Sequence, residues 1–214
     1  MAYIPTADNL GSMFVGDRPD TPSDIFFHDE TGNPAPTNHF NTLSTTLYSP
    51  TGTSLGNLTT TVNDGHGIHV AWGTTSLFTV PGIYSLRSKF TVTNDELVSA
   101  EPLQIVIQAV TGWLTLEQAR ALWADAPLDD VLLYQILETA KTQCIAYAPA
   151  LELTEPIPAN YVQAQALQAR AIYQSLIANQ QDNVGVEGFQ VRVFPLDFTI
   201  RAMLRPKRAI GGMY

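Results

Sequence analysis

The chain is poor in the residues on which covalent and electrostatic functions usually depend. One of its 214 residues is cysteine, which excludes an internal disulfide and fits a reducing compartment such as the cytosol. Only 14% of the residues are charged, against roughly 25% in typical soluble domains, so Thr, Ser, Asn and Gln must cover much of the surface. The net charge of −9 argues against a module that grips nucleic acid through its phosphates.

Long hydrophobic runs are also absent. The densest apolar stretch, residues 131–137, is far too short to span a bilayer. Residues 1–5 lack the basic and apolar regions of a secretion signal. We therefore expect neither membrane insertion nor secretion. The 45% apolar and 9% aromatic content is nevertheless ample for a packed core in one or two domains.

Motifs that carry catalysis or cofactor binding are missing as well. The glycines form neither a dinucleotide fingerprint nor a phosphate-binding loop, and no serine lies in a nucleophile elbow. His66 and His69 are the best local metal ligands, but in an extended segment they point to opposite faces, which favours a turn and a strand. Asp17, Asp20 and Asp24 lack the spacing of a calcium loop and predict an exposed acidic loop. We predict no metal, no cofactor and no enzymatic activity.

Residues 1–110 have the pattern of an all-β domain. They are rich in Thr, Ser, Gly, Asn and Pro, and turn residues separate their short apolar stretches. The clearest strand is 82–92, and residues 43–47 and 103–108 predict two more. The predicted buried face of strand 82–92 is Tyr84, Leu86, Phe90 and Val92. We predict a β-sandwich of about seven strands.

The pattern changes to helical after Gly112, so residues 111–214 are predicted to form a helical bundle. Thr115 and Gln118 have the spacing of a capping box and predict a short helix that ends near residue 124. A longer helix should follow Pro127. Its predicted core stripe is Leu133, Leu137, Ala140, Cys144 and Tyr147. On that stripe the cysteine is predicted to be an inert core residue.

A third helix is predicted from Pro158 to about residue 179. Its predicted apolar stripe is Val162, Ala166, Ala169, Ile172 and Leu176. Its polar flank is uncharged and consists of Gln163, Gln165, Gln168 and Gln174. Because the many alanines permit close helix packing, we predict that a neighbouring subunit occupies this flank.

The carboxyl-terminal segment combines aromatic and basic residues. A short β-like run, 189–194, precedes a last helix predicted from Pro195 to about residue 204. Residues 1–110 hold 10 acids and 3 bases, and residues 111–214 hold 10 acids and 8 bases, so a basic tail ends an acidic chain. Aromatics and Arg are enriched at interface cores, although many termini merely fray. The predicted interface residues are Phe194, Leu196, Phe198, Arg201, Arg205, Lys207 and Arg208.

Several segments of the second half carry a resemblance to a known family: 113–120, 144–150, 158–165, 168–173, 194–198 and 204–208. Taken together, nearly all of 111–214 resembles the helical head-to-tail connector (adaptor) proteins of long-tailed actinobacteriophages. Residues 1–110 are similar, more loosely, to the Ig-like domain at the amino terminus of phage baseplate upper proteins. That second resemblance is carried by the length, by Gly82, Ile83 and Tyr84, and by the closing strand.

The resemblance implies a structural virion protein of the neck, at the head-tail junction, assembled in the host cytoplasm. It implies a ring of about twelve copies beneath the portal protein and above a stopper, tail-tube or tail-terminator protein. Genomic DNA would pass through the ring without sequence-specific binding. The segment from Phe194 to Arg208 would dock onto the portal or the adjacent subunit.

Two other classes of protein are alternatives. A baseplate or receptor-binding tail component would use the Ig-like domain for protein or glycan contact, for which Trp72 and Phe78 are the main aromatic candidates. An enzyme such as a small hydrolase would need a converging acid, base and nucleophile, and the sequence shows no such constellation.

Overall fold

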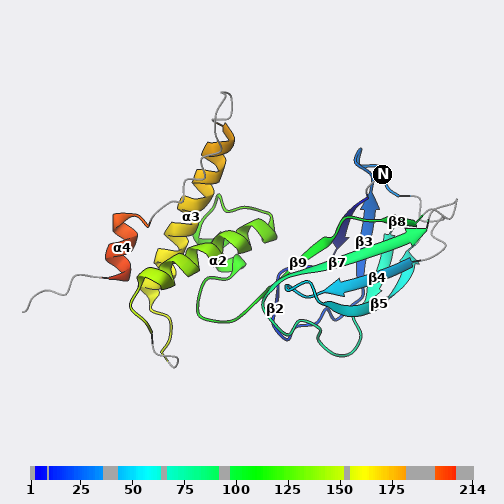
Figure 1. Cartoon of the computed structure of the whole chain (residues 1–214), viewed down its shortest axis with the longest axis horizontal. Coiled ribbons are helices and arrows are strands. Elements are labelled where there is room, and N and C mark those ends of the chain that lie inside the picture. The colour runs from blue at the N-terminus through cyan, green and yellow to red at the C-terminus, as the bar shows by residue number, and fades with distance from the viewer. Residues whose placement is uncertain are drawn as a thin grey trace, which may run out of the picture. The chain divides into compact units, whose positions relative to one another are not determined.

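The computed structural model describes residues 3–8, 10–35, 43–63, 67–91, 97–151, 155–181 and 196–205. The chain has α+β content, with its strands preceding its helices (Figure 1). It divides into two compact units, Met1–Ala109 and Val110–Tyr214.

The described part of the first unit forms one sheet of nine strands. The strands are β1 (Ile4–Asp8), β2 (Met13–Phe14), β3 (Ser23–His28), β4 (Leu43–Tyr48), β5 (Ser54–Asn63), β6 (Gly67–Ala71), β7 (Gly82–Thr91), β8 (Leu97–Ser99) and β9 (Leu103–Gln108). Their order is β1-β3-β6-β5-β4-β7-β9-β2, and β8 pairs with β7. The predicted count of about seven is too low because β2 and β8 have only two and three residues and show no alternation.

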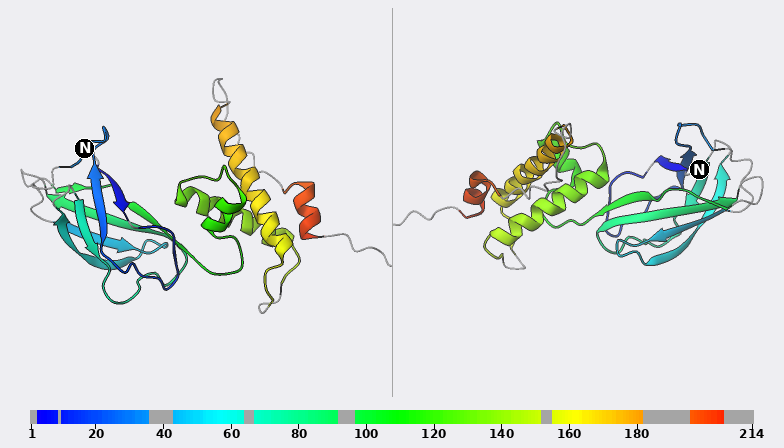
Figure 2. Two further views of the ribbon diagram at one scale, coloured as in Figure 1. Left: turned by 180° about the vertical axis from the view of Figure 1, so that it is seen from behind. Right: turned by 45° about the horizontal axis from the view of Figure 1, so that its top comes forward.

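The sheet curls so that strands far apart in its order face each other (Figure 1 and Figure 2). Phe27 lies on β3 and Phe90 on β7, which are four strand intervals apart. In a flat sheet that separation would be about 19 Å. The two ring centroids are instead 5.3 Å apart. Both halves of the sheet therefore share one apolar interior, which includes Ile25, Leu47, Ile68, Tyr84, Leu86 and Ile107.

Strand β7 confirms the predicted alternation over its described length. Tyr84, Leu86 and Phe90 are buried, and the side chains of Arg87 and Lys89 between them are exposed. Residue 92, the last member of the predicted face, lies outside the described residues. For the closing strand, alternation predicts that Leu103, Ile105 and Ile107 are buried and that the residues between them are exposed. That expectation is wrong, because Val106 and Gln108 of β9 are buried together with Ile105 and Ile107.

The described part of the second unit forms four helices: α1 (Leu116–Leu122), α2 (Asp130–Tyr147), α3 (Ala159–Gln181) and α4 (Phe198–Leu204). Helices α2 and α3 pack on each other, and α4 packs on both (Figure 1). The capping box of α1 is confirmed: Thr115 Oγ1 accepts from the Gln118 amide at 3.2 Å, and Gln118 Oε1 accepts from the Thr115 amide at 3.1 Å. Residues 189–195, with the predicted β-like run and Pro195, lie outside the described residues.

The core stripe predicted for α2 is confirmed. Leu133, Leu137, Ala140 and Cys144 are buried, and Tyr147 packs against the core of this unit. Burial raises the pKa of the Cys144 thiol from its ordinary value of 9.0 to about 11. The thiolate is therefore scarce at neutral pH, as expected for a core residue.

The stripe predicted for α3 is wrong in its rotation about the helix axis. Tyr161, Ala164, Gln165, Gln168 and Ala169 form the buried face. Of the predicted stripe, only Ala169 is fully buried, and Leu176 is exposed. The face is rotated because two glutamines point inward, where their amides find hydrogen-bond partners.

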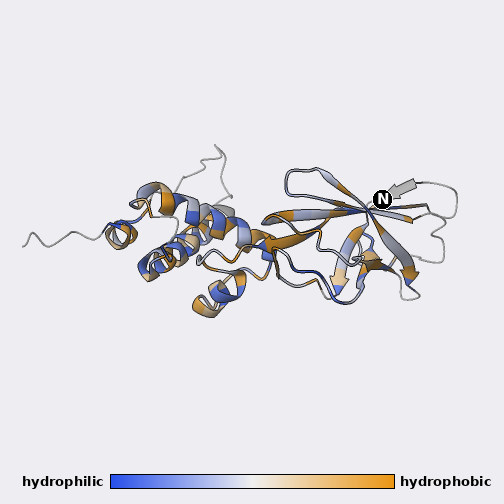
Figure 3. Ribbon diagram, turned by 90° about the horizontal axis from the view of Figure 1, so that it is seen from below, coloured by the Kyte–Doolittle hydropathy of each residue, from blue (hydrophilic) through white to orange (hydrophobic). Residues whose placement is uncertain are grey.

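The helices carry hydrophilic and hydrophobic residues side by side (Figure 3). Among the residues that the structure describes, no helix combines the length and the apolar character needed to cross a membrane.

Candidate interaction site

The residues considered as metal ligands have other partners. His69 of β6 faces Asp24 of β3 across the ladder, and its Nδ1 contacts the Asp24 carboxylate. The same carboxylate accepts from Asn63 Nδ2 at 3.3 Å. His66 lies outside the described residues. In the described ranges, no group of three or more His, Cys, Asp and Glu could hold a metal ion.

Asp17 and Asp20 of the predicted acidic loop line a surface hollow of about 640 Å³ formed by residues 11–13 and 16–20. The prediction is wrong for Asp24, which lies in strand β3 and pairs with His69. Asp17 Oδ2 accepts from the Phe14 amide at 2.8 Å and thereby closes a turn. Arg18 donates to the Gly73 carbonyl at 2.9 Å and lies 3.9 Å from Asp20. These contacts stabilise the loop itself.

The aromatic candidates for glycan contact belong to the core of the β unit. Trp72 is buried, and its Nε1 donates to Ser23 Oγ at 2.8 Å. Phe78 is buried too and meets Tyr84 edge-on, with ring centroids 5.1 Å apart. Neither ring is exposed, so the suggestion that these two residues form a surface platform is wrong.

Two of the four glutamines predicted for an inter-subunit flank are internal. Gln165 and Gln168 are each 1% exposed. Gln165 Oε1 accepts from the Leu114 amide at 2.9 Å, and its Nε2 donates to the Leu137 carbonyl at 3.1 Å. Gln168 Nε2 donates to Gln143 Oε1 at 2.6 Å. Only Gln163 and Gln174 of the predicted flank are exposed, because the other two side chains bond within their own unit.

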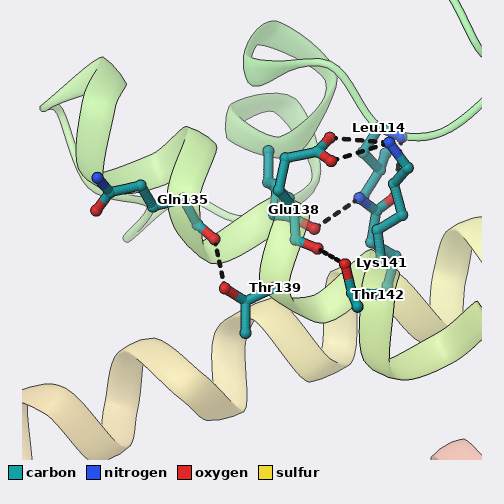
Figure 4. Close-up of polar contacts among 8 residues, drawn as sticks. Leu114, Gln135, Glu138, Thr139, Lys141 and Thr142 are labelled. Atoms are coloured by element: carbon teal, nitrogen blue, oxygen red, sulfur yellow. Dashed lines mark hydrogen bonds and ion pairs between the residues drawn. The ribbon is translucent and has the colours of Figure 1, made fainter. Parts of the chain in front are cut away.

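The polar residues of α2 bond mainly to their own helix (Figure 4). Lys141 Nζ lies 3.0 Å from both carboxylate oxygens of Glu138. The hydroxyls of Thr139 and Thr142 donate to the carbonyls of Gln135 and Glu138, each at 2.8 Å. With these groups already bonded, this part of α2 offers few free donors to a partner.

Helix α4 is anchored to the helical unit by one side. Ile200 and Leu204 are buried in a cluster with Cys144 and Tyr161. Asn160 Nδ2 donates to the Met203 carbonyl at 2.6 Å and ties α4 to the start of α3. Leu196, one of the predicted interface residues, packs against this cluster and therefore points inward.

The other side of α4 presents an aromatic ring and two arginines, which we call the α4 face: Phe198, Arg201 and Arg205. Phe198 is 76% exposed. Arg201 Nε donates to the Leu196 carbonyl at 2.7 Å, and the Arg205 guanidinium lies 4.8 Å over the ring of Tyr147. The remaining predicted interface residues, Phe194, Lys207 and Arg208, lie outside the described residues.

A second exposed apolar surface, which the sequence analysis missed, lies where α1 leads into α2. We call it the corner: Leu122, Asp125, Leu128 and Asp129. Leu122 is 67% and Leu128 91% exposed, and both aspartates are exposed. Arg120 supports this turn by donating to the Leu128 carbonyl at 2.9 Å and to Asp130 Oδ1 at 2.6 Å. The sequence did contain a signal for this surface: Leu128 precedes the N-cap of α2 and is not part of the buried stripe of that helix.

Fold and surfaces together define an α+β protein with a curled β unit, a helical unit and two exposed apolar-and-charged patches on the latter. No family model and no curated protein matches the chain. Among solved structures, the crystal structure of CopC from Methylosinus trichosporium OB3b aligns with 50% of this chain and 95% of its own, at 8% identity and a TM-score of 0.33. We draw no functional conclusion from a similarity of this size.

Proposed function

We propose that the protein is a non-enzymatic structural subunit of a tailed-bacteriophage neck, a head-to-tail connector. About twelve copies would form a ring between the portal and a stopper or tail protein. The starting point is the resemblance of residues 111–214 to the connector proteins of actinobacteriophages.

The observation that carries the proposal is the α4 face. A short helix is held by Ile200 and Leu204, so its opposite side is presented in a defined orientation. That side exposes Phe198, next to Arg201 and Arg205. A large exposed aromatic ring with neighbouring arginines is typical of an interface hot spot. An interface is what a connector needs at this segment.

The net negative charge of the chain supports a ring through which DNA passes without being tightly bound. With 20 acids against 11 bases, each copy carries a net negative charge, which repetition around a ring would multiply. An acidic channel repels phosphates, so DNA could slide through without being held.

For the β unit we propose a sandwich of the Ig-like kind, acting as a peripheral domain that contacts a capsid or tail protein. The support is the approach of Phe27 to Phe90 across the interior, which makes two opposed halves of one curled sheet. Because sandwiches serve many functions, the fold does not identify the partner. The burial of Trp72 and Phe78 disfavours the rival proposal of a glycan-binding tail component.

The test is mass photometry and negative-stain microscopy of the purified protein, alone and mixed with a portal complex. A ring of about twelve copies, alone or only on the portal, is the expected result. Trimers, or a monomer indifferent to the portal, would overturn the proposal. A chain truncated after Leu204 should lose portal docking; docking that survives the truncation would exclude the tail as the docking element.

A further inference from the structure

The α4 face and the corner lie at opposite ends of α2. Arg205 of the α4 face stacks over Tyr147, the last residue of α2. The corner is joined to Asp130, the first residue of α2, through Arg120. At 1.5 Å rise per residue, these ends are about 26 Å apart. The two surfaces of one copy therefore cannot meet each other, whereas those of two copies can.

The two surfaces are alike in leaving large apolar side chains in water. Leu122 and Leu128 are exposed on the corner, and Phe198 is exposed on the α4 face. Both surfaces lie on anchored structure. Trp123, behind the corner, meets Tyr173 edge-on with ring centroids 5.3 Å apart, and Ile200 and Leu204 hold α4. Contact between the two surfaces would remove this apolar area from water.

Their charges are opposite, and neither set is neutralised by an ion pair among the described residues, although Asp129 also caps α2 by accepting from the Leu132 amide. Arg201 and Arg205 bond to a carbonyl and an aromatic ring, and no ion pair of the described residues includes either of them, although Asp197 is close in sequence. On the corner, Arg120 neutralises Asp130 but leaves Asp125 and Asp129 exposed without a basic partner among the described residues. Opposite charges around an apolar centre give an interface both attraction and orientation.

We propose that the α4 face of one copy binds the corner of a second copy, so that helical units associate head to tail. The inference deepens the proposed function, on which it rests for its biological setting, because a ring of identical subunits requires one heterologous contact repeated around the axis. It assigns Phe198, Arg201 and Arg205 to the neighbouring copy and leaves the portal to other surfaces.

The test is oxidative cross-linking of a full-length variant that carries Leu128→Cys and Phe198→Cys. Native Cys144 should not form disulfides, because it is buried and the pKa of its thiol is raised. Each doubly substituted copy can bond two neighbours, so the concentrated protein alone should give a ladder of covalent oligomers. Each single variant should form no covalent oligomers, and an equal mixture of the two should stop at covalent dimers.

A matched control pairs Phe198→Cys with Ile145→Cys, since Ile145 is exposed on α2 but belongs to neither surface. This control should give no ladder. A ladder equally strong in the control, no ladder from the Leu128 and Phe198 pair, or a dimer from one single variant would each overturn the inference. A single-variant dimer would indicate a twofold contact.

Charge reversal gives a second test that does not depend on oxidation. Arg201→Glu or Asp125→Arg alone should abolish the oligomers, and the double variant should restore them. Failure of the double variant to restore assembly contradicts the inference. Portal binding without any ladder would leave the neck proposal intact and reject this contact. A ladder from a protein that neither closes into a ring nor binds the portal would support this contact and reject the neck proposal.

Discussion

Gln165 donates from Nε2 to the carbonyl oxygen of Leu137, 3.1 Å away, in the interior of the helical unit. The Leu137 carbonyl belongs to α2, so a side chain of α3 binds the backbone of the helix that it packs against. The Oε1 atom of Gln165 accepts from the backbone amide of Leu114, and this bond fixes the segment leading into α1. One buried glutamine therefore joins three parts of the unit.

Gln165→Ala should lower the free energy of unfolding of the helical unit by about 1–3 kcal/mol, because the Leu114 amide loses its partner and the Leu137 carbonyl keeps only its bond within α2. The control is Gln163→Ala on the exposed side of α3, which should change stability by less than about 0.5 kcal/mol. Urea denaturation followed by far-ultraviolet circular dichroism measures both. Equal midpoints for the two variants would show that the amide does not stabilise the unit.

Gly67→Ala should destabilise the β unit. A Cβ at Gly67 would overlap the Ile25 carbonyl oxygen and lie 3.0 Å from Cδ1 of Phe26. These atoms belong to β3, which pairs with β6, so relief of the overlap would disturb the ladder. We expect a loss of about 3 kcal/mol. Gly11→Ala is the control, since nothing lies within 4 Å of a Cβ at this position. Its thermal unfolding temperature should stay near that of the parent. An unchanged unfolding temperature in Gly67→Ala would contradict the packing described.

Cys144 should make the protein less stable at high pH. Its pKa is about 11 in the folded chain against an ordinary 9.0, so between these values the unfolded chain loses a proton that the folded chain keeps. The contribution is thus fully present below pH 9 and is lost as pH rises towards 11, on the order of 2 kcal/mol. Denaturation of the parent and of Cys144→Ala across this range measures it. The parent should fall more steeply; parallel curves would argue against a raised pKa.

Asp29 should titrate far below an ordinary aspartate. The Thr31 hydroxyl and the Asn33 amide donate to its carboxylate at 2.6 and 2.9 Å and lower its pKa from 3.8 to about 2. The stabilisation of this turn is present above pH 3.8 and is lost as pH falls towards 2. NMR titration of the carboxyl carbon should give a midpoint near 2. Thr31→Ala should raise it, and Thr51→Ala, in a different turn, should not; a midpoint unmoved by Thr31→Ala would exclude that hydroxyl as the main cause.

The elements that the sequence predicted correctly depend on residues close together in the chain. The capping box of Thr115 and Gln118 spans three residues, and the α2 stripe through Leu133 and Cys144 follows from helical periodicity alone. The alternation of β7 has the same local origin. The change from strands to helices was visible because each kind of element leaves its own short-range pattern.

Other features were decided only by the tertiary structure. The approach of Phe27 to Phe90 depends on the curl of the whole sheet, and the corner became visible only when Leu128 proved to be left out of the core. Gln165 and Gln168 have the same side chain as their exposed neighbour Gln163. They are buried in the helical unit because their amides find hydrogen-bond partners on α2. A glutamine amide is stable in water or in a fully bonded interior. Local sequence therefore determined which elements form, while packing between distant segments decided which polar and apolar side chains reach the surface.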